Sequence, residues 1–65
     1  MRITVNGESS QIAAEKLAAA LDELGYGAAR VATAVNGEFV PAAMRADHAL
    51  CEGDRLEILA PRQGG

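Results

Sequence analysis

The chain has 65 residues, a formal net charge of −3 and two aromatic residues, Tyr26 and Phe39. A chain of this length forms one small domain, whose core has little room for a deep substrate pocket. Its six basic residues are scattered along an acidic chain. Nucleic-acid binding is therefore not expected, because phosphate contacts need clustered Lys and Arg.

A single cysteine, Cys51, excludes a disulfide within the chain and is typical of a reducing compartment. The sequence shows no charged-then-apolar leader and no apolar run of about 18 residues, so neither secretion nor membrane insertion is expected. We therefore expect a cytoplasmic protein that is a monomer when alone.

The N-terminal residues predict a β-hairpin. Ile3 and Val5 alternate with Arg2 and Thr4, which is the two-residue period of a half-buried strand. The dipeptide Asn6-Gly7 follows, and it favours the positive φ angles of a type I′ turn. The residues up to Ile12 should therefore return antiparallel to the first strand.

A helix is expected next, from about Ala14. Three leucines at helical spacing define its apolar face: Leu17, Leu21 and Leu24. Gly25 occupies a position where glycine commonly ends a helix. The start is less well defined, because Lys16 stands where Ser, Thr or Asp would serve as the N-cap.

The second half of the chain predicts another hairpin. Residues 31–35 show the strand alternation, and Asn36-Gly37 provides a second turn signal before a short strand at residues 38–40. Pro41 cannot donate a hydrogen bond to a neighbouring strand, so that strand should end there or lie at an edge of the sheet.

The remaining residues predict a final strand. Residues 42–49 are expected to form an irregular turn or a short helical piece, and Leu50-Cys51 a brief strand. Residues 52–54 read as a turn, because Gly and Asp favour such positions. Residues 55–59 are the last strand, with Leu56 and Ile58 on one face.

The order β-β-α-β-β, with a short extra strand in the second half, predicts an α+β protein with a ubiquitin-like β-grasp fold. Its mixed sheet of four or five strands would be covered on one face by one main helix, because a small sheet must bury its apolar side. From this fold class we infer that the first and last strands lie side by side and parallel in the centre. Residues 1–60 would form the β-grasp domain, and residues 61–65 a flexible C-terminal tail.

The tail is the most informative segment of the sequence. Gly64 and Gly65 have no side chains and add little to a core, since glycine loses more entropy on ordering than other residues. Such an end can thread a narrow active-site channel and present a carboxylate to a reagent. A frayed terminus without a function is the alternative, and the two glycines alone do not decide between them.

Other candidate sites are weaker. His48 and Cys51 are too few for a structural zinc site, which uses four Cys or His ligands, so no metal site is expected. A lone cysteine near a strand is more often a small structural residue than a nucleophile, so no catalytic residue is expected. Phe39, Val40 and the apolar residues of the last strand are a candidate docking patch.

Three motifs together resemble the ThiS family of the MoaD/ThiS superfamily, the sulfur carriers of thiamine biosynthesis. They are residues 36–41 (NGEFVP), residues 53–58 (GDRLEI) and the final Gly64-Gly65, and residues 3–8 (ITVNGE) add to a resemblance over essentially the whole chain. Two positions depart from the pattern: Ala42 stands where the family often has arginine, and Arg45 follows in place of a nearby tryptophan. These departures bear on the partner more than on the fold.

The resemblance implies a mechanism in which Gly65 is modified. An E1-like adenylyltransferase of the ThiF type would use MgATP to form an acyl-adenylate at the Gly65 carboxylate. Persulfide sulfur, supplied indirectly by a cysteine desulfurase, would then convert it to a thiocarboxylate, and a thiazole synthase of the ThiG type would accept the sulfur. The chain would be a protein co-substrate rather than an enzyme, and would bind no cofactor itself. Four preceding residues would enter the partner active sites: Pro61, Arg62, Gln63 and Gly64.

Two alternatives stay open. The chain could be a sulfur carrier of another pathway, similar to the small subunit of molybdopterin synthase, although those proteins usually have an additional central stretch. It could also belong to a different class, as a ubiquitin-like modifier joined to lysines through Gly65, or as a binding module whose diglycine is incidental.

Overall fold

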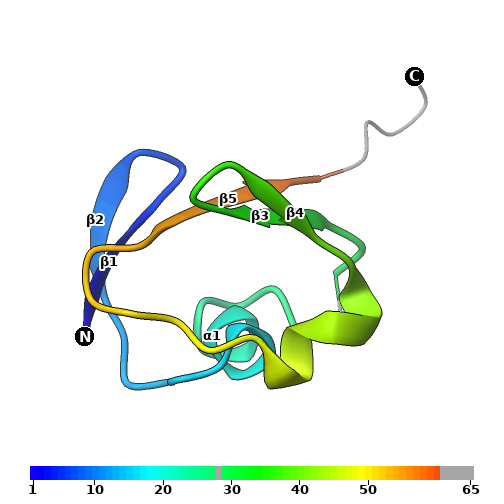
Figure 1. The fold of residues 1–65 in the computed structure, drawn as a ribbon, viewed down its shortest axis with the longest axis horizontal. Coiled ribbons are helices and arrows are strands. Elements are labelled where there is room, and N and C mark those ends of the chain that lie inside the picture. Colours follow the sequence, from blue (N-terminus) through cyan, green and yellow to red (C-terminus); the bar gives the residue numbers. More distant parts are fainter. Residues whose placement is uncertain (28, 61–65) are drawn as a thin grey trace.

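The computed structural model describes residues 1–27 and 29–60, and Figure 1 shows their arrangement. Within these residues the chain forms a five-stranded sheet of order β2-β1-β5-β3-β4. The elements are β1 (Arg2–Val5), β2 (Glu8–Gln11), α1 (Leu17–Glu23), β3 (Ala32–Val35), β4 (Glu38–Val40), the 3-10 helix η1 (Ala42–Asp47) and β5 (Arg55–Leu59). The predicted α+β class with a ubiquitin-like β-grasp fold is confirmed. The division at residue 60 stays a prediction, since residues 61–65 are not described.

The first and last strands are neighbours in the sheet and run parallel, as inferred from the fold class. Thr4 lies opposite Arg55, and Val5 lies opposite Leu56. On its other side β5 pairs antiparallel with β3, so that Ala32 lies opposite Leu59. The C-terminal strand is therefore held between two neighbours in the middle of the sheet.

Both Asn-Gly turns are type I′, as the sequence predicts. Asn6 and Gly7 have φ angles of 51° and 86°, and Asn36 and Gly37 have almost the same values, 52° and 86°. Asn tolerates this left-handed region better than other residues with a side chain, and Gly adopts it without steric cost. Each turn joins an antiparallel pair, β1 with β2 and β3 with β4.

The helix begins at Leu17, so the prediction of a start near Ala14 is wrong. Tertiary contacts hold the preceding residues extended: Lys16 has φ −114° and ψ 152° and forms an isolated bridge with Ala49. The N–H of Leu17 donates to the carbonyl of His48 (2.8 Å). The Lys16 side chain makes no capping hydrogen bond, so this contact with a distant segment takes the place of a side-chain cap.

The end of α1 follows the sequence prediction. Gly25 adopts φ 92° directly after the C-cap residue Leu24. The N–H of Tyr26 donates to the carbonyl of Leu21 (2.7 Å), and the N–H of Gly25 donates to that of Asp22 (3.1 Å). These two bonds form a Schellman motif, in which glycine at C′ lets the chain reverse while the last helical carbonyls find partners.

The predicted strand at Leu50-Cys51 is wrong, whereas the short helical piece before it is confirmed as η1. Leu50 is buried beside the start of the helix, and its N–H donates to the carbonyl of Glu15 (2.9 Å). The apolar character of Leu50 reflects packing against α1 and does not reflect pairing within the sheet.

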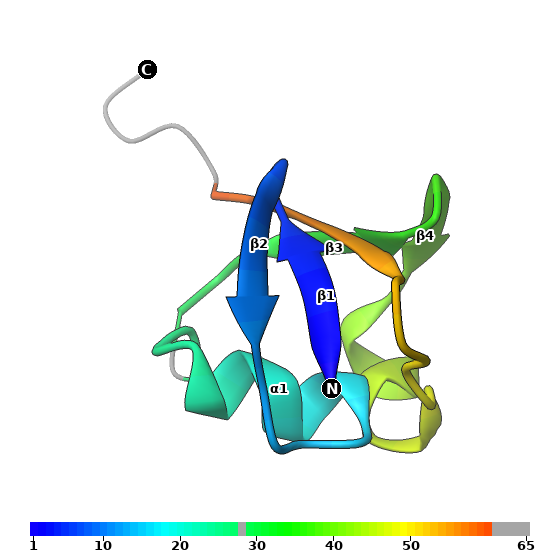
Figure 2. The ribbon, with the colours of Figure 1, turned by 90° about the vertical axis from the view of Figure 1, so that its left-hand side faces the viewer.

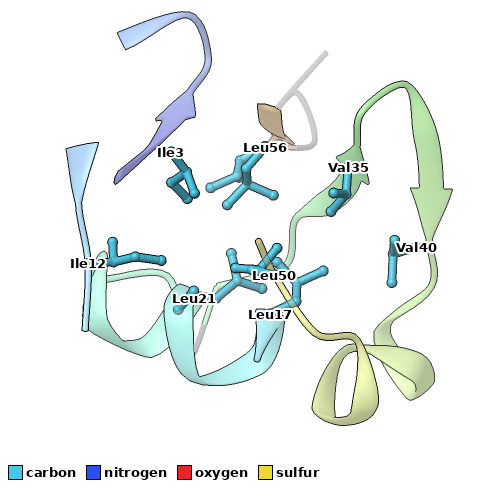
Figure 3. Close-up of a cluster of buried hydrophobic side chains, with 10 residues drawn as sticks. Ile3, Ile12, Leu17, Leu21, Val35, Val40, Leu50 and Leu56 are labelled. Carbon is cyan, nitrogen blue, oxygen red and sulfur yellow. The ribbon is translucent and has the colours of Figure 1, made fainter. Parts of the chain in front are cut away.

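The core lies between the sheet and α1, which covers one face (Figure 2). Side chains from the sheet point toward those from the helix and its flanking loops (Figure 3). The buried apolar residues are Ile3, Ile12, Leu17, Ala20, Leu21, Val35, Val40, Leu50, Leu56 and Ile58. Leu24 and Tyr26 pack against this cluster while partly exposed. Across the described residues, no helix has the length and apolar character needed to cross a bilayer.

Candidate functional site

The candidate site is the end of β5 together with the tail that the sequence analysis singled out. All five tail residues, Pro61, Arg62, Gln63, Gly64 and Gly65, lie outside the described residues, so their roles stay predictions. The structure describes the strand that leads to them, up to Ala60. The surroundings of this strand therefore show the part of the domain to which the tail is attached.

The side chains of β5 alternate between the two faces of the sheet. Leu56 and Ile58 point into the core, with 1% and 5% of their surface exposed, as the sequence predicts. Leu59, directly after Ile58, is 70% exposed on the opposite face. The inner residues thus fix the strand in the domain, and the last one presents an apolar side chain to solvent.

The side chain of Asn6 contacts β5 near its end. Its Nδ2 donates to the carbonyl of Ile58 (3.2 Å), and the N–H of Ile58 donates to its Oδ1 (2.8 Å). Both backbone polar groups of this buried residue are therefore satisfied by one side-chain amide. The sequence identified Asn6 as a turn residue, but nothing local indicated this second role.

Asn36 makes a related contact at the other end of the strand. The N–H of Arg55 donates to Oδ1 of Asn36 (2.9 Å), and Nδ2 of Asn36 donates to Oδ1 of Asp54 (3.0 Å). Oδ2 of Asp54 in turn accepts the N–H of Cys51 (2.8 Å), which closes the turn before β5. The two hairpin asparagines therefore hold opposite ends of β5, and sequence reasoning missed both contacts.

The outer face of the sheet carries an apolar patch close to the tail. Leu59 lies opposite Ala32 on β3, and the next outward-facing residue of β3, Ala34, lies opposite Phe39, which is 67% exposed. We call Ala32, Ala34, Phe39 and Leu59 the outer apolar patch; the exposed carboxylate of Glu57, opposite Ala34, lies on the same face. Phe39 and one residue of the last strand thus agree with the predicted docking patch. The prediction is wrong for Val40, and for Leu56 and Ile58 of the last strand, which point inward and are buried because strand neighbours face opposite sides.

A shallow depression of about 550 Å³ adjoins the patch where β5 ends. Its lining includes Arg30, Val31, Ala32, Arg45, Leu59 and Ala60. Two of these residues are cationic, so this side of the tail attachment is both apolar and positively charged. An acidic and apolar surface of another protein would complement it.

Arg45, one of the two departures noted in the sequence, has a structural role. Its Nε donates to Oγ1 of Thr33 (3.1 Å), and its Nη2 donates to the carbonyl of Val31 (2.5 Å). The Thr33 hydroxyl donates to the carbonyl of Val40 (2.8 Å). These bonds tie η1 to β3 and β4. Ala42, the other departure, lies exposed at the start of η1 beside the same depression.

One carboxylate outside this region has a shifted pKa. Hydrogen bonds from the N–H groups of Ala13 and Ala14 lower the pKa of Glu23 below its ordinary value of 4.5. The donor-to-oxygen distances are 2.9–3.1 Å. Glu23 thus fixes the connection between β2 and α1, and the shift belongs to chain folding rather than to chemistry at the tail.

The remaining candidates stay apart from this region. Cys51 is a free, exposed thiol. Among the described residues, no group of three or more His, Cys, Asp or Glu side chains could hold a metal ion. The expectations that the chain binds no cofactor and performs no catalysis of its own stay predictions.

Comparisons with known proteins identify the family. The model of the ThiS family matches residues 3–65, which includes both hairpins, β5 and the diglycine. The chain belongs to the ThiS family. This family consists of small sulfur carrier proteins of thiamine biosynthesis, and the resemblance drawn from the sequence motifs is confirmed.

A solved structure supports the same assignment. The crystal structure of the thiamine biosynthesis protein ThiS from Geobacter metallireducens matches with a TM-score of 0.83 and 30% identity, covering 100% of both chains. Among curated proteins, the chain is 39% identical to a thiazole synthase of Paramagnetospirillum magneticum over 66 residues. The chain spans only about a fifth of the length of that relative (20%).

Proposed function

We propose that this ThiS-family chain carries sulfur as a thiocarboxylate on Gly65 and donates it to thiazole formation. The observation that carries the proposal is the family match, which runs from β1 through Gly65. A free carboxylate at Gly65 is part of the proposal. The placement of β5 in the centre of the sheet supports it, because a rigid body can then present the tail to other proteins.

The chemistry requires activation of Gly65 by a partner, since a carboxylate at neutral pH is a poor electrophile. In the proposed sequence, an E1-like enzyme joins the Gly65 carboxylate to AMP and releases pyrophosphate from MgATP. A persulfide sulfur attacks the acyl carbon and displaces AMP, and a thiol then breaks the resulting S–S bond to leave the thiocarboxylate. The thiol is oxidised to a disulfide in that last step.

The tail residues would act by position. Pro61, Arg62, Gln63 and Gly64 would place the Gly65 carboxylate in the active sites of the two partners, and the absence of side chains at the end would allow close approach. ATP and Mg²⁺ would be bound by the activating enzyme. The chain itself would act as a co-substrate.

Two findings support the kinds of partner proposed. The relative named thiazole synthase contains a stretch similar to this chain, which supports a ThiG-type sulfur acceptor. Leu59 and Ala32 of the outer apolar patch line the cationic depression together with Ala60, where a partner that receives the tail must approach. An activating enzyme of the ThiF type and a cysteine desulfurase as sulfur source complete the proposal.

Intact mass spectrometry tests this function. The chain is incubated with MgATP, an E1-like activating enzyme, a cysteine desulfurase, cysteine and a thiol reductant. We expect a mass gain equal to the exchange of one oxygen for sulfur, located at Gly65 and absent without ATP. The mass of the protein purified from its own cells should also correspond to a chain that ends at Gly65.

Deletion of Gly65 provides the matched control. The shortened chain should lose sulfur loading and keep the melting temperature of the full chain, because the deleted glycine has no side chain that could contribute to a core. Loading of the shortened chain at the normal rate would contradict the proposal. Loading of the full chain followed by sulfur transfer only to a molybdopterin synthase would assign it to the alternative pathway, and lysine conjugates in cells would indicate a protein modifier.

A further inference from the structure

The parallel contact between β1 and β5 ends before β5 does. The N–H of Thr4 donates to the carbonyl of Asp54 (3.0 Å), and the N–H of Asn6 donates to that of Leu56 (2.9 Å). At Asn6 the chain turns away into β2, since both residues of the turn have positive φ. Without another partner, the backbone of Ile58 would have no hydrogen bonds on this side.

The Asn6 side chain provides that partner. A carboxamide has one carbonyl acceptor and one N–H donor arranged like those of a peptide group. Oδ1 accepts from the N–H of Ile58 (2.8 Å), and Nδ2 donates to its carbonyl (3.2 Å). Asn6 therefore extends the hydrogen bonding on this side of β5 from Leu56 to Ile58, after its own strand has ended.

We propose that Asn6 is a positioning residue that holds the end of β5 and thereby sets the direction in which the chain leaves the sheet toward the partner active sites. This inference rests on the proposed function. Ile58 is the last inward-facing residue of β5, and the residue after it, Leu59, pairs with β3, opposite Ala32. Within residues 1–27 and 29–60, the Asn6–Ile58 pair therefore forms the last hydrogen bonds that join β5 to the β1 side.

A fixed starting direction matters for a tail that must enter a narrow site. A tail that begins from one orientation loses less conformational freedom on binding, which favours a lower KM for the carrier in loading. The effect should appear in KM rather than in kcat, because once the tail is inserted the reacting atoms are the same. A role limited to global stability would not produce such a split at temperatures where both proteins are folded.

The side-chain requirement is specific. Asn6→Gly keeps the positive φ angle available and removes both hydrogen bonds. Asn6→Asp keeps an acceptor for the N–H of Ile58, but places a second carboxylate oxygen against the Ile58 carbonyl, where the amide donates now. Both variants should therefore release the end of β5 without straining the turn.

The second hairpin supplies a matched control. Asn36 has the same turn type and nearly the same φ angle, and its side chain contacts β5 at Arg55, the end remote from the tail. Asn36→Gly removes two hydrogen bonds, as Asn6→Gly does. The hydrogen bonds of Asn6 are partly buried and those of Asn36 are exposed, so Asn6→Gly should lose more thermal stability. Loading is therefore compared at a temperature where both variants are folded, so that a difference between them reports the end of β5 and not the global fold.

The experiment combines amide hydrogen exchange with loading kinetics on the full chain. We expect Asn6→Gly to accelerate exchange at Ile58 at least tenfold, and to raise the KM of the carrier in adenylation by about tenfold with kcat unchanged. Asn36→Gly should leave both quantities within about twofold of the wild type, because the Asn36 side chain contacts Arg55 and Asp54 and leaves the hydrogen bonds of Ile58 in place. Asn6→Asp should behave as Asn6→Gly does.

Opposite results would overturn the inference. Equal KM values for the Asn6→Gly and Asn36→Gly variants, or unchanged exchange at Ile58 in the former, would show that the Asn6 amide does not position the tail. Failure of the wild-type chain to load, in an assay that loads an authentic carrier, would instead overturn the proposed function. The exchange comparison is independent of sulfur chemistry, so in that case it still shows whether the Asn6 side chain protects the N–H of Ile58.

Discussion

The two faces of the sheet have opposite relations to solvent, although both carry apolar residues. On the inner face Leu56 is 1% exposed, and on the outer face Leu59, three residues later on the same strand, is 70% exposed. The difference arises because one helix covers only one face (Figure 2). Apolar residues on the inner face therefore stabilise the domain, and those on the outer face are available to a partner.

Replacing one leucine by alanine on each face of β5 should produce the largest difference in the free energy of unfolding. Leu56→Ala should lower the free energy of unfolding by about 2–5 kcal/mol, because it leaves a cavity in a packed core. For a small domain of about 5 kcal/mol total stability, this change can unfold most molecules. Leu59→Ala should change it by less than about 0.5 kcal/mol. Urea denaturation followed by circular dichroism measures both.

The same pair sharpens the functional side of the comparison. Leu59→Ala should weaken loading by raising the KM of the carrier, since the outer apolar patch adjoins the tail attachment. If Leu59→Ala destabilised the domain as much as Leu56→Ala, the assignment of stability to the inner face and recognition to the outer face would be wrong.

Thr33 is the one polar side chain buried on the inner face of the described sheet, and its substitution tests what the hydroxyl contributes to stability. It is 1% exposed, donates to the Val40 carbonyl and accepts from Nε of Arg45. Thr33→Val keeps the shape but leaves both groups without this partner, so we expect a loss of about 1–3 kcal/mol in the free energy of unfolding. Thr33→Ser, which keeps the hydroxyl, should lose less, and the reverse order would contradict the role of the hydroxyl.

Glu23 should give the smallest effect, and one that depends on pH. Its pKa in the folded protein lies below the ordinary value of 4.5, because the charged form accepts the N–H groups of Ala13 and Ala14. The stabilisation is therefore fully present above pH 4.5 and is lost as the pH falls through the lower folded-state value. Wild type should be more stable than Glu23→Gln at neutral pH, and the difference should shrink below pH 4.5.

Melting temperatures of wild type and Glu23→Gln, measured between neutral and acidic pH, report this difference in stability. Glu38→Gln is the control, because Glu38 is an exposed carboxylate on β4, away from this connection. A difference between wild type and Glu23→Gln that grew on acidification would contradict the assigned hydrogen bonds, since protonation removes the charge that they stabilise.

Local sequence signals were sufficient for the elements whose conformation is set by neighbouring residues. The two Asn-Gly dipeptides predicted the hairpins correctly, because few other residue pairs adopt two consecutive positive φ angles. Gly25 gave the end of α1 for the same steric reason. Alternation at residues 55–59 gave the last strand and its inner face.

Local signals failed where distant segments take over the backbone hydrogen bonds. Residues 14–16 have helical composition, yet the N–H of Ala14 donates to the Glu23 carboxylate, and contacts of residues 15–17 with residues 48–50 hold this stretch outside the helix. Leu50 is apolar like a strand residue, but its N–H donates to the carbonyl of Glu15 and not to a neighbouring strand of the sheet. Propensity is a weak preference compared with such tertiary contacts, so neither outcome is visible in a window of adjacent residues.

The sequence alone was sufficient for the order of the elements, the resemblance to the ThiS family and the diglycine as the candidate reactive end, because these depend on motifs and local periodicity; the pairing of the first and last strands was inferred from the fold class. Only the tertiary structure decided that Val40 is buried while Phe39 and Leu59 are exposed, and that Asn6 holds Ile58. Asn6 and Ile58 are 52 residues apart in sequence, and their contact exists only because β1 lies beside β5. Local periodicity specifies the strands, whereas side-chain contacts between them depend on which strands the folded sheet brings together.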